Sequence, residues 1–124
     1  MKAIAVITTV GTEQEANELA EELLGRRLAA CVNIVSGVRS VYRWKGRICK
    51  DSEYLLVIKS MEEEVEEISA TIRELHSYEL PEVLAIPIQG GDDRFLDWIA
   101  ECVDKNLLAD DDYDDDLESG DRPA

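Results

Sequence analysis

The order of strand-like and helix-like segments constrains the fold of this chain more than any other feature. Runs rich in aliphatic and β-branched residues predict strands, and apolar residues at helical spacing predict three helices. The segments follow one another as β-α-β-β-α-β-α. The predicted strands cover residues 2–10, 28–35 continued by 38–44 beyond a bend at Gly37, 48–60 and 82–89.

The first six segments match the split βαβ pattern of a ferredoxin-like fold. That pattern predicts an α+β protein in which helices cover one face of a four-stranded antiparallel sheet. The third predicted helix follows the last strand, so it is an addition to this pattern. We therefore expect a ferredoxin-like βαββαβ sandwich with an extended β-hairpin and an extra C-terminal helix.

Local signals support the predicted helix starts and the hairpin turn. Thr12 with Glu15, and Ser60 with Glu63, have the spacing of capping boxes at the starts of the first two helices. Lys45-Gly46 predicts a tight hairpin turn, because glycine adopts a positive φ without strain.

The predicted hairpin, residues 38–49, is long for a single subunit. Tyr42 and Trp44 lie on its alternating face. A two-stranded ribbon is only marginally stable alone in water, and its edges need cover. We therefore predict a closed homo-oligomer built on this ribbon.

The net charge limits the classes of partner. The chain has 28 acidic and 13 basic residues, a formal net charge of −15, and residues 110–124 contain eight of the acids with one arginine. We predict one domain, residues 1–109, followed by an acidic disordered tail, residues 110–124. Binding of nucleic acid through its phosphates is not expected, because that requires clustered Lys and Arg.

Membrane association is not expected either. No apolar run approaches the length of a membrane span, and the N-terminal residues predict no signal peptide. Three cysteines at wide spacing do not form a disulfide framework. A reducing cytoplasm is the simplest prediction.

The segment from Glu74 to Ile88 contains the candidate site. It includes His76, the only histidine, with Tyr78 and Glu82 around a proline turn. Imidazole is a common copper or zinc ligand, although a histidine at a helix end can instead interact with the helix dipole. Cys31, Glu79, Glu82 or a symmetry-related His76 could complete a metal site. Cys31 lies in an apolar strand, which favours a small buried residue over a ligand.

Several segments together resemble the divalent-cation-tolerance (CutA) family. They occur in order across residues 2–106, and only the acidic tail lies outside. The matching pieces are Leu28-Ala29-Ala30-Cys31-Val32-Asn33-Ile34, Ser40-Val41-Tyr42-Arg43-Trp44-Lys45-Gly46-Arg47-Ile48, Glu53, Ile58-Lys59-Ser60, His76-Ser77-Tyr78, Leu80-Pro81-Glu82-Val83-Leu84 and Phe95-Leu96-Asp97-Trp98-Ile99.

The resemblance implies a homotrimer similar to the nitrogen-regulatory PII trimers, with the hairpin between subunits. Family members are linked to tolerance of divalent metals, some bind copper, and no reaction is firmly assigned. Copper-binding bacterial members carry a cysteine and a second histidine where this chain has Thr8 and Leu75.

Our leading hypothesis is a non-enzymatic trimeric metal-response protein that could bind copper or another divalent ion through His76 and Cys31. A ligand would bind in an inter-subunit cleft, near His76, Tyr78, Glu82, Glu53 and Lys59. One alternative is a PII-like adaptor trimer that senses a small anionic ligand. Another is an enzyme in which Lys59 anchors an anion and His76 acts as acid or base. No protein partner can be named from the sequence.

Overall fold

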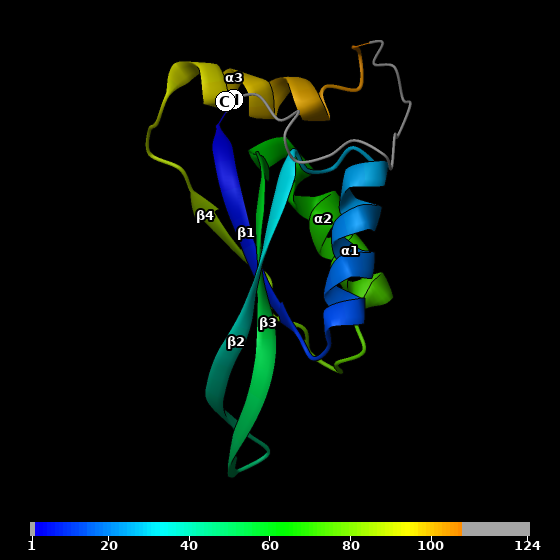
Figure 1. Ribbon diagram of the computed structural model, residues 1–124, viewed down its shortest axis with the longest axis vertical. Helices are drawn as coiled ribbons and strands as arrows, with labels where there is room; N and C mark the ends of the chain where they lie inside the picture. Colours follow the sequence, from blue (N-terminus) through cyan, green and yellow to red (C-terminus); the bar gives the residue numbers. More distant parts are fainter. Residues whose placement is uncertain (1, 108–124) are drawn as a thin grey trace.

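The chain folds into a four-stranded sheet with two helices on one face and a third helix at one end (Figure 1). The computed structural model describes residues 2–107, so the predicted tail and the predicted domain end at residue 109 lie outside the described residues. No helix within residues 2–107 is long and apolar enough to cross a membrane. The elements are β1 (Ala3–Val10), α1 (Glu13–Gly25), β2 (Cys31–Trp44), β3 (Arg47–Met61), the 3-10 turn η1 (Glu62–Glu64), α2 (Val65–Leu75), β4 (Leu84–Pro87) and α3 (Asp93–Val103).

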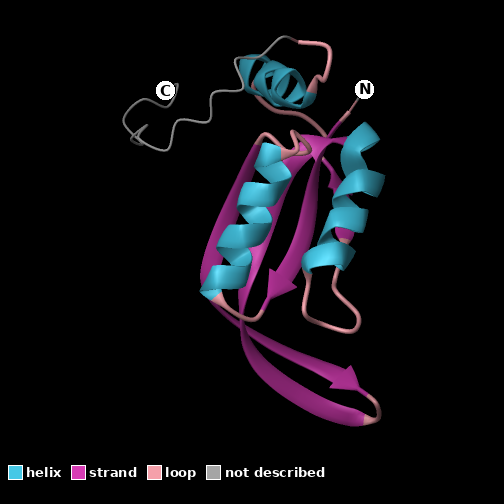
Figure 2. Cartoon of the chain, turned by 90° about the vertical axis from the view of Figure 1, so that its right-hand side faces the viewer, coloured by secondary structure: helices cyan, strands magenta, loops and turns pink. Residues whose placement is uncertain are grey.

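The sheet has the strand order β2-β3-β1-β4, and every neighbouring pair is antiparallel. α1 and α2 lie side by side against the same face of this sheet (Figure 2). This topology confirms the predicted ferredoxin-like fold, including the extra C-terminal helix. The last strand is shorter than residues 82–89, because only Leu84–Pro87 pair with β1.

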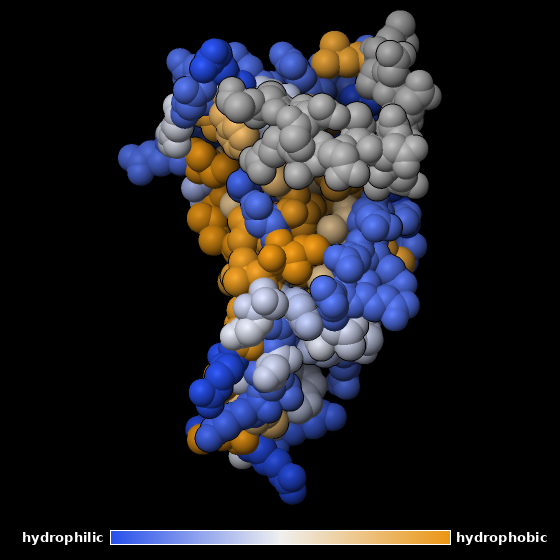
Figure 3. Space-filling view, viewed as in Figure 1, coloured by the Kyte–Doolittle hydropathy of each residue, from blue (hydrophilic) through white to orange (hydrophobic). Residues whose placement is uncertain are grey.

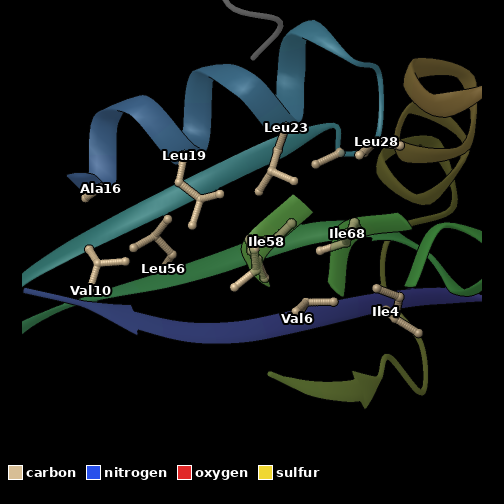
Figure 4. Close-up of a cluster of buried hydrophobic side chains, with 12 residues drawn as sticks. Ile4, Val6, Val10, Ala16, Leu19, Leu23, Leu28, Leu56, Ile58 and Ile68 are labelled. Atoms are coloured by element: carbon tan, nitrogen blue, oxygen red, sulfur yellow. The ribbon is translucent and has the colours of Figure 1, made fainter. Parts of the chain in front are cut away.

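The main core lies between this face and the two helices (Figure 4). Leu19 and Leu23 of α1 and Ile68 of α2 meet Val6 and Ile58 from the sheet, and all five are fully or almost fully buried. Burial of each such side chain stabilises the fold by about 1.5–3 kcal/mol. Because Val6 and Ile58 lie in this core and side chains alternate along a strand, the even-numbered residues of β1 and β3 face the helices.

The first predicted capping box forms only in part. The hydroxyl of Thr12 accepts a 3.1 Å hydrogen bond from the amide of Glu15, as expected. The carboxylate of Glu15 does not reach back to Thr12, because it accepts the amide of Ser77 at 2.9 Å. α1 is thereby tied to the segment that follows α2.

The second predicted capping box is wrong. Ser60 still belongs to β3, where its buried hydroxyl donates a 2.6 Å hydrogen bond to the carbonyl of Leu28. β3 continues to Met61, and the turn Glu62–Glu64 precedes α2. Ser60 therefore stabilises the junction of α1 with β2 rather than the start of a helix.

β2 and β3 extend together beyond the rest of the sheet, as Figures 1 and 2 show. β1 pairs with β3 only from Tyr54 onward, so residues 38–53, here called the hairpin arm, have no third strand. Gly37 has a φ of +77° where the register shifts between Val35 and Val38, and this confirms the predicted bend. The turn Lys45-Gly46 is also confirmed, with φ of 50° and 80°.

The second face of the sheet is covered by neither α1 nor α2, and we call it the open face. It presents the odd-numbered residues of β1 and β3 and the even-numbered residues of β4. Leu84 and Ile86 are 55% and 48% exposed there, and Figure 3 shows hydrophobic residues gathered above the hydrophilic hairpin arm. At one end, α3 packs Ile99 and Val103 against Ala3 and Met61.

Candidate functional site

A cleft of about 660 Å³ lies between the hairpin arm and the segment after α2. We call that segment, residues 76–83, the proline turn. Tyr42, Trp44 and Glu53 line the cleft from the arm, and Tyr78, Glu79 and Glu82 line it from the proline turn. A volume of this size is typical of sites that bind small organic molecules.

His76 begins the proline turn, and its side chain is fully buried beneath the rest of that turn. Its Nε2 is 2.6 Å from the carbonyl oxygen of Thr9, which can only accept, so Nε2 carries the proton and donates. Its Nδ1 accepts the amide of Tyr78 at 3.0 Å. Both ring nitrogens are therefore occupied, and the imidazole joins β1 to the proline turn.

Glu15 holds the same turn from the side of α1. Its carboxylate accepts from the amide of Ser77 at 2.9 Å and from the hydroxyl of Ser77 at 3.3 Å, and it lies 3.7 Å from Nδ1 of His76. Contacts from β1 and α1 therefore fix the start of the proline turn. Tyr78, two residues after His76, is directed toward the hairpin arm by this anchoring.

The hydroxyl of Tyr78 donates a 2.7 Å hydrogen bond to the carboxylate of Glu53. Burial and the Glu53 carboxylate together raise the pKa of Tyr78 above its usual range, so the phenol remains a donor at neutral pH. Glu53 is only 6% exposed. Within residues 2–107 no Lys, Arg or His side chain forms an ion pair with it.

Gly11 allows Tyr78 to reach this position. A Cβ atom at Gly11 would lie 3.2 Å from the Tyr78 hydroxyl oxygen, which is closer than ordinary contact. The φ of Gly11 is not in the left-handed region, so space, rather than backbone freedom, favours glycine here.

A second phenol on the hairpin arm has a carboxylate partner. The hydroxyl of Tyr42 donates to Asp51 on the neighbouring strand. This hydrogen bond, with a smaller effect of burial, raises the pKa of Tyr42 to about 12. The contact holds the two strands of the arm in register beside the cleft.

Three of the predicted site residues meet at the cleft, namely Glu53, Tyr78 and Glu82. The predicted role of His76 as acid or base receives no support from the subunit, because both nitrogens are engaged beneath the turn. Lys59 lies at the other end of β3, six positions or about 20 Å from Glu53. Its ammonium sits 5.8 Å from the ring centre of Phe95.

The predicted metal pair of His76 and Cys31 does not come together within one subunit. Cys31 pairs with Lys59, which pairs with Ala5 of β1. His76 contacts Thr9, which is four residues or about 13 Å further along that strand. Among residues 2–107 no three His, Cys, Asp or Glu side chains form a group that could hold a metal ion.

Sequence reasoning missed several residues of this site. From the sequence, Gly11 and Glu15 were connected only with the start of α1. Arg43 entered only as part of a segment that resembles the family. Thr9 closes the cleft from β1 and Leu80 from the proline turn. Glu15 gave no sequence signal of this role, because its capping-box spacing predicts a carboxylate that turns back to Thr12.

The fold and the site define a class of protein. They describe a ferredoxin-like subunit with a projecting hairpin, an open apolar face and a cleft at the base of the hairpin. Such a subunit is suited to assembly and ligand binding.

The comparisons with known proteins assign the family. The model of the family described as "CutA1 divalent ion tolerance protein" matches residues 4–102. The chain therefore belongs to this family. Protein CutA, chloroplastic, of Arabidopsis thaliana is 42% identical over 97 residues, which cover 78% of this chain but 53% of that protein. The divalent-cation tolerance protein CutA of Thermus thermophilus is 42% identical over 96 residues, which cover 77% of this chain and 93% of that protein.

The solved structures agree on the fold. The crystal structure of CutA1 from Oryza sativa superposes with a TM-score of 0.82 at 37% identity, covering 85% of this chain and 96% of that chain. The resemblance inferred from the sequence is thereby confirmed, and so is the fold class. The chain covers only about half the length of the Arabidopsis relative.

Proposed function

We propose that this chain acts in divalent-cation tolerance as a non-enzymatic closed homotrimer. The observation that carries the proposal is the open face of the sheet. Leu84 and Ile86 lie beside Ile7 and Ala5 on that face, and neither α1 nor α2 covers them. A second copy of the chain that buried this face would remove apolar surface from water, which is the main driving force for stable association.

The hairpin arm supports the same assembly. Ile48 is 66% exposed on the arm, and residues 38–53 pair only with each other. Packing of the arm against a neighbouring subunit would cover its edges and stabilise a ribbon that is marginal alone. A closed ring of three subunits would satisfy every arm in the same way.

A growth experiment tests the tolerance role. The full chain is expressed in a bacterium that lacks its own family member, and growth is followed at increasing copper concentration. We expect the wild-type chain to raise the copper concentration that stops growth. Ile86→Asp should not raise it, because a charge on the open face opposes assembly. Equal protection by both chains would overturn the link between assembly and tolerance.

Direct copper binding at His76 is not part of this proposal. A copper ion there would have to replace the bonds to Thr9 and to the amide of Tyr78, and Cys31 is too distant within the subunit to assist. We propose a reducing compartment such as the cytoplasm, because three cysteines at wide spacing in the sequence do not form a disulfide framework.

A second candidate function is ligand sensing at the cleft. We infer it from the cleft itself, because its volume of about 660 Å³ lies in the range of small-molecule sites and its lining combines aromatic and carboxylate side chains. Lys59 does not reach the cleft, so it cannot anchor the small anionic ligand that the sequence suggested. A metabolite panel tests this function by thermal shift. A shift that disappears in Tyr78→Phe would support sensing, and no shift with any compound would contradict it.

A further inference from the structure

We propose that the cleft at the base of the hairpin arm binds an organic ammonium ion, with Glu53 as its counter-charge. The proposal rests on the ligand-sensing function above and names the class of ligand. It depends on the burial of Glu53, the aromatic walls and the charge of the lining.

The burial of Glu53 is the first observation. The residue is 6% exposed and lines the cleft, yet its described partner is a neutral phenol rather than a cation. Buried charges in proteins are normally paired with an opposite charge or with a metal ion. The Tyr78 hydroxyl occupies Oε2, so Oε1 remains for a ligand that brings a positive charge.

The aromatic walls are the second observation. Tyr42, Trp44 and Tyr78 line the same cleft. The face of an aromatic ring attracts an ammonium group, most strongly when the ring belongs to Trp. The indole of Trp44 already has such a contact, with the ammonium of Lys45 5.7 Å from the ring centre.

The charge of the lining is the third observation. Glu53, Glu79 and Glu82 face a single base, Arg43. The whole chain has a net charge of −15, which raises the local concentration of cations. An anion would therefore be repelled from this cleft, whereas an ammonium ion would be attracted.

The size and chemistry favour an organic cation over a bare metal ion. The part of the chain that the structure describes has no group of three metal ligands, and the cleft is far larger than an ion. Aromatic surface contributes to binding only if the ligand has an apolar body. Alkylated or primary ammonium compounds combine that body with a positive charge.

The test is calorimetric titration of the full chain with choline and with putrescine. Their uncharged analogues, dimethylbutanol and butanediol, serve as matched ligands. We expect saturable binding of at least one ammonium compound, one per subunit, and at least tenfold weaker binding of its uncharged analogue. Glu53→Gln keeps an acceptor for Tyr78 but removes the charge, and it should weaken binding at least tenfold. Glu13→Gln, an exposed substitution in the first turn of α1, should leave binding unchanged.

A second variant keeps the proposal testable if Glu53→Gln fails to fold. Glu82 is exposed at the edge of the cleft, so Glu82→Gln should fold normally and weaken binding severalfold. The proposal is overturned if neither ammonium compound binds better than its analogue. It is also overturned if the folded Glu53 and Glu82 variants bind as the wild type does. In the metabolite panel, a thermal shift caused only by uncharged or anionic compounds would contradict this inference. The same result would still support ligand sensing at the cleft.

Discussion

Tyr78 and Glu53 are separated by 25 positions in the chain and joined by a 2.7 Å hydrogen bond. The bond connects the proline turn to the hairpin arm and so fixes the shape of the cleft. Its geometry depends on His76 and Glu15, which hold the start of the turn against β1 and α1. The shape of the cleft is therefore set by contacts within one subunit.

Removing the phenolic hydroxyl should destabilise the protein. Tyr78→Phe leaves the buried carboxylate of Glu53 without its donor, and such a loss costs about 1–3 kcal/mol. Urea unfolding at fixed protein concentration measures the change. Tyr54→Phe is the control, because Tyr54 lies next to Glu53 but packs its ring against the core. Equal stability of the wild type and Tyr78→Phe would contradict the role of the bond.

Gly11 should be sensitive to a single added methyl group. In Gly11→Ala the new Cβ lies 3.2 Å from the Tyr78 hydroxyl, which must shift by a few tenths of an ångström. We expect a loss of about 1 kcal/mol in the free energy of unfolding. The loss should shrink in the Tyr78→Phe background, where the clashing oxygen is absent. Gly90→Ala serves as the control, since a Cβ there meets no atom within 4 Å. If the effects of Gly11→Ala and Tyr78→Phe on the free energy of unfolding were additive, the close approach of position 11 to the Tyr78 hydroxyl would be refuted.

Stability at alkaline pH should report on the same phenol. The folded pKa of Tyr78 is raised above the ordinary value of 10, so the unfolded phenol ionises first as the pH rises. This contribution is fully present below pH 10 and is lost above it, at up to about 1.4 kcal/mol per pH unit. Tyr78→Phe should flatten the fall in the free energy of unfolding. Identical alkaline slopes in the two proteins would show that the phenol is not protected by folding.

Copper titration should leave the imidazole untouched. Both nitrogens of His76 are hydrogen-bonded inside the protein, so added copper(II) should bind without coordination by this imidazole. Electron paramagnetic resonance distinguishes the two cases, because nitrogen ligands split the copper signal. Nitrogen coupling that is present in the wild type and lost in His76→Gln would reverse this conclusion.

The sequence was sufficient to predict the fold because its signals are local. Apolar periodicity located the strands and helices, and Gly37 and Lys45-Gly46 marked the bend and the turn of the hairpin. The Ser60 signal misled, because the apolar run of β3 continued through Met61 and left the hydroxyl buried in the sheet.

The candidate site was predicted less completely. Tyr78 and Glu82 were found because they surround a proline beside the only histidine. Cys31 was grouped with them as a possible soft ligand and Lys59 because it shares a strand face with Glu53, whereas the strand register places both at the far end of the sheet. The roles of Gly11 and Glu15 depend on contacts between segments more than 60 positions apart, and such contacts leave no local pattern.

The molar mass of the full chain in solution, measured by multi-angle light scattering, is the most direct test of the proposed assembly. A closed homotrimer has three times the 13.9 kDa of one chain, or about 42 kDa. We expect this mass for the wild type and a smaller one for Ile86→Asp, whose new charge lies on the open face. A wild-type mass near 13.9 kDa across a wide range of concentration would contradict the account.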